Sequence, residues 1–103
     1  MMDTPDAATV PAALAAYPIV DAHVHVFPPR VFEAVWRWFD RYGWPIRYKL
    51  HARETVRFML ERGVSHVVGL HYAHVPGLAA PLNRFAAELA AEEPRLVACA
   101  TVL

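Results

Sequence analysis

The chain of 103 residues has little or none of several features that mark common protein classes. It contains one cysteine, Cys99, so an internal disulfide is excluded, and we expect a reducing compartment and a buried, unreactive thiol. Lysine and arginine balance aspartate and glutamate at 10 each, without a basic cluster. This balance gives no sign of a nucleic-acid or anionic-membrane partner. A glycine-rich phosphate loop and a paired-cysteine zinc motif are also absent from the sequence.

The sequence also lacks segments that direct a protein into or across a membrane. No apolar run approaches the roughly 20 residues that a membrane span requires. Residues 1–17 are small, acidic and interrupted by proline, without the basic and apolar regions of a secretory signal. We therefore expect a cytoplasmic protein with no membrane partner. Residues 1–17 are expected to be a loosely ordered segment, followed by one domain over residues 18–103.

What the chain does have is an excess of apolar residues and six histidines. Two of these histidines lie in the segment Ile-Val-Asp-Ala-His-Val-His-Val-Phe, residues 19–27. On a β-strand the side chains alternate between faces, so Asp21, His23 and His25 would share one face. Two imidazoles in this spacing can converge on one divalent cation, with zinc–nitrogen distances of about 2.0–2.1 Å. The alternative is a half-buried strand whose polar face meets water, although histidine is unusual on such a face.

The rest of the chain alternates between strand and helix patterns. Strand patterns cover residues 19–27, 64–71 and 96–103. Helix patterns cover residues 31–42, residues 52–62, and a segment from Pro81 to the residues before Pro94. The second and third strands are dominated by apolar residues, which is typical of parallel strands covered by helices on both faces. The order predicts an α/β fold built from right-handed βαβ units.

The strand Val-Asp-Ala-His-Val-His, residues 20–25, resembles the first-strand signature of the amidohydrolase superfamily. Residues 36–45, 62–68 and 70–74 are similar to its amidohydrolase-2 branch, which contains hydrolases and non-oxidative decarboxylases of the aminocarboxymuconate-semialdehyde type. The resemblance implies a metal-dependent TIM (β/α)8 barrel. Because a complete barrel needs about 250 residues, residues 18–103 would form its N-terminal three βα units, with parallel strands and flanking helices, as an apparently truncated part.

The resemblance also implies a metal site. His23 and His25 match the two metal ligands at the C-terminal end of the first barrel strand, and zinc is the expected cofactor. The remaining ligands and a catalytic aspartate would lie on later strands that this sequence does not contain. No catalytic residue is therefore assigned, and we expect the 103-residue chain alone to be inactive.

Three further residues are candidates for supporting roles. Asp21 could orient an imidazole from behind the metal site or accept hydrogen bonds from backbone donors. His71 and His74 follow the second strand, where the loops of a barrel build the active site. They are candidate substrate or auxiliary metal contacts, with ordinary loop histidines as the alternative.

Three functional hypotheses remain open from the sequence. The first is a metal-dependent hydrolase acting on a small carbonyl or carboxylate compound. The second is a metal-dependent decarboxylase with the same metal site. The third is a non-catalytic α/β module that associates into a homo-oligomer through its sheet edges and the aromatic tract of residues 36–44. Core packing, a subunit interface and a substrate lid are the alternatives for that tract.

Overall fold

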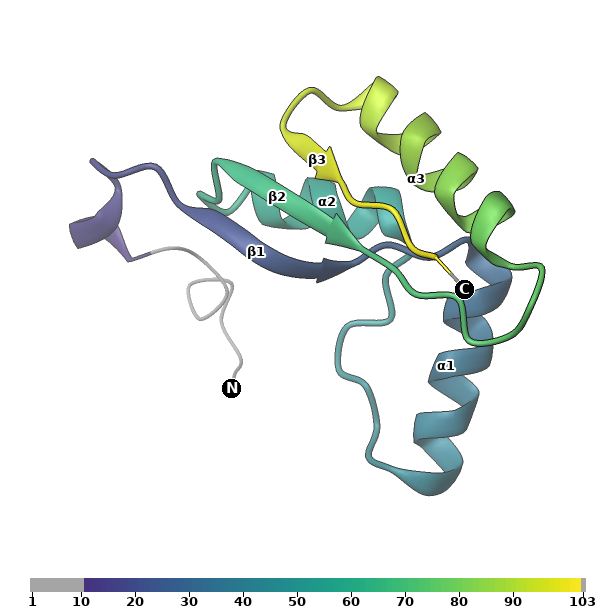
Figure 1. The fold of residues 1–103 in the computed structure, drawn as a ribbon. Coiled ribbons are helices and arrows are strands. Elements are labelled where there is room, and N and C mark those ends of the chain that lie inside the picture. The colour runs from purple at the N-terminus through teal and green to yellow at the C-terminus, as the bar shows by residue number, and fades with distance from the viewer. Residues whose placement is uncertain (1–10, 103) are drawn as a thin grey trace.

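Three parallel strands form one open sheet in the computed structural model, which describes residues 11–102 (Figure 1). The strands are β1 (Val20–His25), β2 (His66–Leu70) and β3 (Leu96–Ala98), paired in the order β1-β2-β3. The helices are α1 (Pro29–Tyr42), α2 (Ala52–Leu60) and α3 (Ala79–Glu92), and a 3-10 turn, η2 (Ala12–Leu14), precedes β1. The predicted α/β class and parallel pairing are confirmed. The loose order expected for residues 1–17 falls largely on residues 1–10, outside the described range.

The core lies between one face of the sheet and the helices. Val24 and Val67 on neighbouring strands join Leu96 of β3 in a cluster of buried residues that also contains Val56 of α2 and Leu89 of α3. The buried side chains of α3 recur at helical spacing and turn one stripe of the helix toward the sheet. Figure 1 shows α2 behind the strands and α3 running beside β3. Helices α2 and α3 therefore form a single layer against this face of the sheet.

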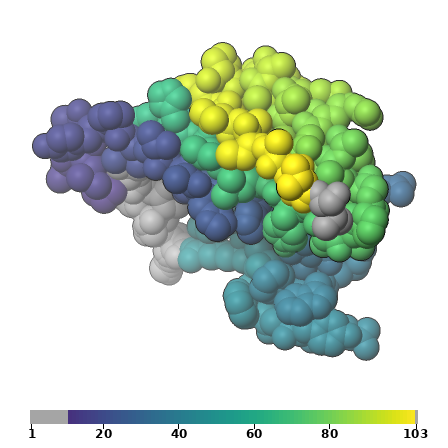
Figure 2. All heavy atoms as spheres, viewed as in Figure 1, coloured from purple at the N-terminus to yellow at the C-terminus, as the bar shows by residue number. Residues whose placement is uncertain are grey.

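The opposite face of the sheet is not covered by helices, so the prediction that β2 and β3 are covered on both faces is wrong for the described residues. Val20 and Val97 are 55% and 54% exposed, and the atoms of these strands lie at the surface in Figure 2. In a sheet of order β1-β2-β3, right-handed crossovers place every helix on the same side. Apolar composition alone does not show how many faces of a strand are covered.

Two further expectations about the end of the sheet are corrected. The third strand was predicted to reach Leu103 but ends at Ala98, and its pairing with β2 continues only through the hydrogen bond from the Cys99 N–H to the Gly69 carbonyl, 3.1 Å. Cys99 was predicted to be buried but is exposed. Beyond Ala98 the chain is instead held to α3, where the backbone of Thr101 exchanges two hydrogen bonds with the side chain of Asn83.

Helix α1 stands at the carboxyl end of β1 and projects away from the sheet (Figure 1). It shares the crossover from β1 to β2 with α2, so the three helices do not follow the three strands one by one. Trp36 stacks on Phe32, with ring centroids 5.6 Å apart, and so connects α1 to the core. Farther along, Trp38 and Trp44 are 54% and 66% exposed. The aromatic tract is thus divided between core packing and an exposed surface.

None of the helices within residues 11–102 has the length and apolar character needed to cross a bilayer.

Candidate metal site

His23 and His25 lie side by side on the helix-free face of β1. Their Nε2 atoms are 3.2 Å apart and their ring centroids 5.1 Å apart. Val24, between them in the sequence, is buried in the core, so the two imidazoles point the other way. The structure therefore brings together the two side chains that the sequence pattern singled out. Both are exposed, on an open sheet rather than in a closed interior.

The separation of the two nitrogens suits a shared cation. Two zinc–nitrogen bonds of about 2.0–2.1 Å at a tetrahedral angle would place the nitrogens about 3.3 Å apart. The observed 3.2 Å is close to this distance, and it is also the length of the hydrogen bond between the two ring nitrogens. Within the described residues no group of three or more histidine, cysteine, aspartate or glutamate side chains is placed to hold a metal. The pair fits two positions of a tetrahedral site, one fewer than a catalytic zinc usually receives from protein.

The environment of His25 favours its uncharged form. Burial lowers the pKa of His25, and the nearby His23 lowers it further, because a second positive charge would be repelled. The His25 ring also lies 5.7 Å from the ring of Phe27 and 6.0 Å from that of Tyr72, measured between centroids. Neutral imidazole is the form that ligates a metal, so this environment suits the proposed role.

Asp21 supports the backbone at the first histidine. The pairing of β1 with β2 shifts register between Asp21 and Val24, which pair with residues two apart on β2. The register therefore puts Asp21 on the face of Val24, and the prediction that it shares a face with His23 and His25 is wrong. At this irregularity the Asp21 carboxylate accepts a hydrogen bond from the backbone N–H of His23, 3.0 Å. An aspartate that bonds a backbone N–H two residues ahead commonly stabilises such local turns. Two roles were considered for Asp21, and its hydrogen bond is that of an acceptor for a backbone donor. The Asp21 carboxylate makes no hydrogen bond to either imidazole.

His71 and His74 occupy different environments. His71 is buried, and its Nε2 lies 2.6 Å from Oδ1 of Asn83 on α3. The Asn83 amide also exchanges two hydrogen bonds with the backbone of Thr101, and Nδ1 of His71 is buried without a partner. His74 is exposed, and its ring lies 6.0 Å from that of Tyr72. His71 therefore packs the loop after β2 against α3, whereas His74 stays accessible to a ligand.

Two other histidines have no place at this site. His51 is the N-cap residue of α2; its N–H donates to the Glu54 carboxylate, 3.0 Å, and its Nε2 lies 3.2 Å from Oε2 of Glu33 on α1. His51 therefore connects the start of α2 to α1. His66 begins β2 and is exposed, although it lies inside the strand pattern of residues 64–71. The reason is again the uncovered face of the sheet.

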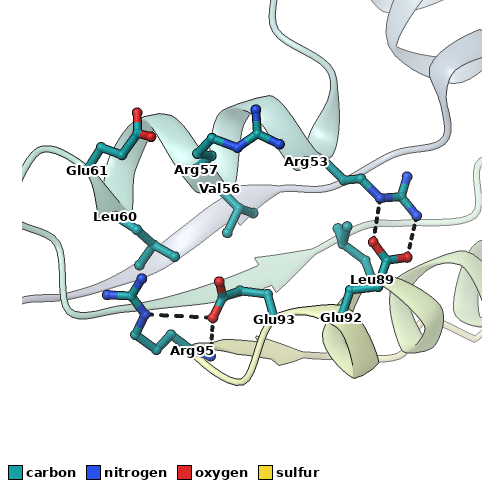
Figure 3. Close-up of a pocket in the computed structure, with 9 residues that line it drawn as sticks. All are labelled: Arg53, Val56, Arg57, Leu60, Glu61, Leu89, Glu92, Glu93 and Arg95. Atoms are coloured by element: carbon teal, nitrogen blue, oxygen red, sulfur yellow. Dashed lines mark hydrogen bonds and ion pairs between the residues drawn. The ribbon is translucent and has the colours of Figure 1, made fainter.

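A cavity of about 320 Å³ lies between α2 and α3 on the helical side (Figure 3). Arg53 and Glu92 form a two-bond ion pair across it, with distances of 2.7 and 2.6 Å. The hydrogen bond from Arg53 lowers the pKa of the Glu92 carboxyl. Sequence reasoning missed this pair because its members are 39 residues apart, and no local spacing rule joins them. Exposed ion pairs of this kind contribute little to stability, and we assign the cavity no chemistry.

Comparisons of the chain with models of protein families, with curated proteins and with solved structures gave no match. The functional argument therefore depends on the residues and their geometry.

Proposed function

We propose that His23 and His25 bind a zinc ion in a metal-dependent hydrolase of the amidohydrolase type, acting on a small carbonyl or carboxylate compound. The observation that carries the proposal is the 3.2 Å separation of the two Nε2 atoms on the helix-free face. These side chains also lie toward the carboxyl end of β1, where parallel α/β folds usually place their active sites. The parallel strands with helices on one side are compatible with the first units of a barrel, whose interior would be this helix-free face.

The chain's residues would prepare and hold the metal. His25 has a lowered pKa and so offers a neutral ring at pH 7, and the Asp21 carboxylate holds the backbone of His23 in place. When bound, zinc lowers the pKa of its water to about 7 and polarises a substrate carbonyl. A metal held by these two imidazoles would need further ligands from water, from substrate or from other donors of a barrel.

The proposal is tested by measuring zinc binding to the 103-residue chain by calorimetry. We expect one zinc per chain, binding lost in the double variant H23A/H25A, and unchanged binding in His66→Ala. His66 is a matched control because it is an exposed histidine at the start of the neighbouring strand. If the double variant keeps the stoichiometry of the parent chain, the proposed site is wrong.

A decarboxylase would use the same metal site and is distinguished by its product. Release of CO2 from a carboxylate substrate, without cleavage of amides or esters, would identify that reaction. The assay is made on the longest natural form of the protein that contains these residues, because the two imidazoles fill only part of a catalytic site.

A second candidate function, a non-catalytic association module, is favoured by the uncovered sheet. Within residues 11–102, β1 and β3 each have one unpaired edge, and Val20 and Val97 are exposed on the open face. Unpaired edges and exposed apolar residues are sites at which chains associate. Sedimentation with metal analysis separates the two functions. A stable, stoichiometric oligomer that contains no metal and is unaffected by H23A/H25A would favour the association module.

A further inference from the structure

A groove of about 440 Å³ runs between α1 and the loop that follows β2. One wall is the face of α1 that carries Arg30, Ala34 and Trp38, which are four residues apart and therefore lie in one row on the helix. Tyr72 and His74 form the other wall. A volume of this size is within the range of about 300–1,000 Å³ that is usual for small-molecule sites.

The lining of the groove is apolar and aromatic, with Arg30 as its one arginine or lysine and no acidic side chain. By contrast, Lys49 has an acidic partner, Asp40 at 3.0 Å, and Arg53 bonds Glu92. For Arg30 no hydrogen bond or ion pair of the guanidinium is found within residues 11–102. The groove thus combines an available cation with the exposed rings of Trp38 and Tyr72.

We propose that this groove binds a small planar organic anion, with its carboxylate on Arg30 and its ring against Trp38 and Tyr72. The planar guanidinium presents parallel N–H donors that match the two oxygens of a carboxylate. The aromatic walls offer flat apolar surface to a ring. Since the lining contains no carboxylate, nothing there repels an anion.

The groove borders the imidazole pair but does not depend on it. The ring of Tyr72 lies 6.0 Å from that of His25 on one side and 6.0 Å from that of His74 on the other, between centroids. A ligand in the groove would therefore lie next to the proposed metal site. The inference goes beyond that site, because Arg30, Trp38 and Tyr72 form the groove whether or not a metal is bound.

The test is a titration of the metal-free chain with 2-naphthoate, followed by the NMR signal of the Trp38 indole N–H, which is assigned with Trp38→Phe. We expect the chemical shift of this indole N–H to change with the concentration of 2-naphthoate and to reach a plateau. The neutral analogue 2-naphthamide and the variant Arg30→Gln should each weaken binding by about tenfold, the size of one charge-assisted contact. The matched control is Arg37→Gln, because Arg37 is also exposed on α1 but does not line the groove. The affinity of this variant for 2-naphthoate should stay within about twofold of that of the parent chain.

Several results would overturn the proposal: no saturable shift, equal affinity for the acid and the amide, or unchanged affinity in Arg30→Gln. Each variant is first checked by circular dichroism; both arginines are exposed, so their replacement should leave the fold intact. The same titration on metal-free H23A/H25A separates this inference from the proposed function. If that variant binds naphthoate but the parent chain binds no zinc, the groove stands and the metal site fails.

Discussion

Gly69 of β2 lies so close to Val26 that a Cβ atom on the glycine would stand 2.9 Å from Cγ2 of the valine. The same Cβ would be 3.0 Å from Cδ1 of Leu96 on the other neighbouring strand. Gly69 is buried and pairs with Val24 on one side and Ala98 on the other. A residue without a side chain at this point lets Val26 and Leu96 fill the core above the central strand.

Gly69→Ala is therefore expected to destabilise the protein by about 1–3 kcal/mol, the usual cost of overpacking a core. Both contacts involve buried side chains that have little room to move. The free energy of unfolding is measured by urea denaturation. Val97→Thr, an exposed change on β3 that keeps a branched side chain, should stay within about 0.5 kcal/mol. Equal stability of the Gly69→Ala variant and the parent chain would contradict the packing described here.

Asn83→Ala should lower the free energy of unfolding by about 1–3 kcal/mol, because it leaves the buried His71 and the partly buried backbone of Thr101 without hydrogen-bond partners. Asn83 accepts from His71 at 2.6 Å and from the Thr101 N–H at 2.8 Å, and donates to the Thr101 carbonyl at 2.9 Å. The control is Arg84→Ala, an exposed change at the next position of α3. If both variants unfold at the same urea concentration, the network does not hold the end of the chain to α3.

The imidazole of His25 should titrate below its ordinary pKa of about 6.5 when followed by NMR. Burial is the main cause and the neighbouring His23 the second, so His23→Gln should raise the pKa of His25 part of the way back. As the pH falls, the unfolded chain takes up this proton before the folded chain does. The contribution of His25 to stability is thus present above pH 6.5 and is lost as the pH falls through the folded-state pKa. A His25 pKa at or above 6.5 in the parent chain would refute this account.

The exposed thiol of Cys99 should react with Ellman's reagent in the native protein, at one thiol per chain and without denaturant. A buried cysteine would react only on unfolding. The variant Cys99→Ser gives the background signal of the Ellman assay. Reaction that requires urea would show that the face of the sheet near Cys99 is covered in solution, for example by association of chains.

The sequence by itself determined the local features. The helix patterns predicted both ends of α1, α2 and α3 to within about two residues, because helix ends are marked by proline and glycine and by the spacing of apolar residues. The alternation of His23, Val24 and His25 predicted the paired imidazoles, because the period of a strand places residues two apart on the same face.

Only the tertiary structure decided which surfaces are covered and which distant residues meet. Apolar strands predicted two covered faces, but the helices lie on one face, so Cys99, His66 and Val97 are exposed. The bond between His71 and Asn83, and the groove between α1 and the loop after β2, join residues with no fixed spacing in the chain. Contacts of this kind depend on how the crossovers bring the elements together in space, and the local periodicity of the sequence does not specify that arrangement.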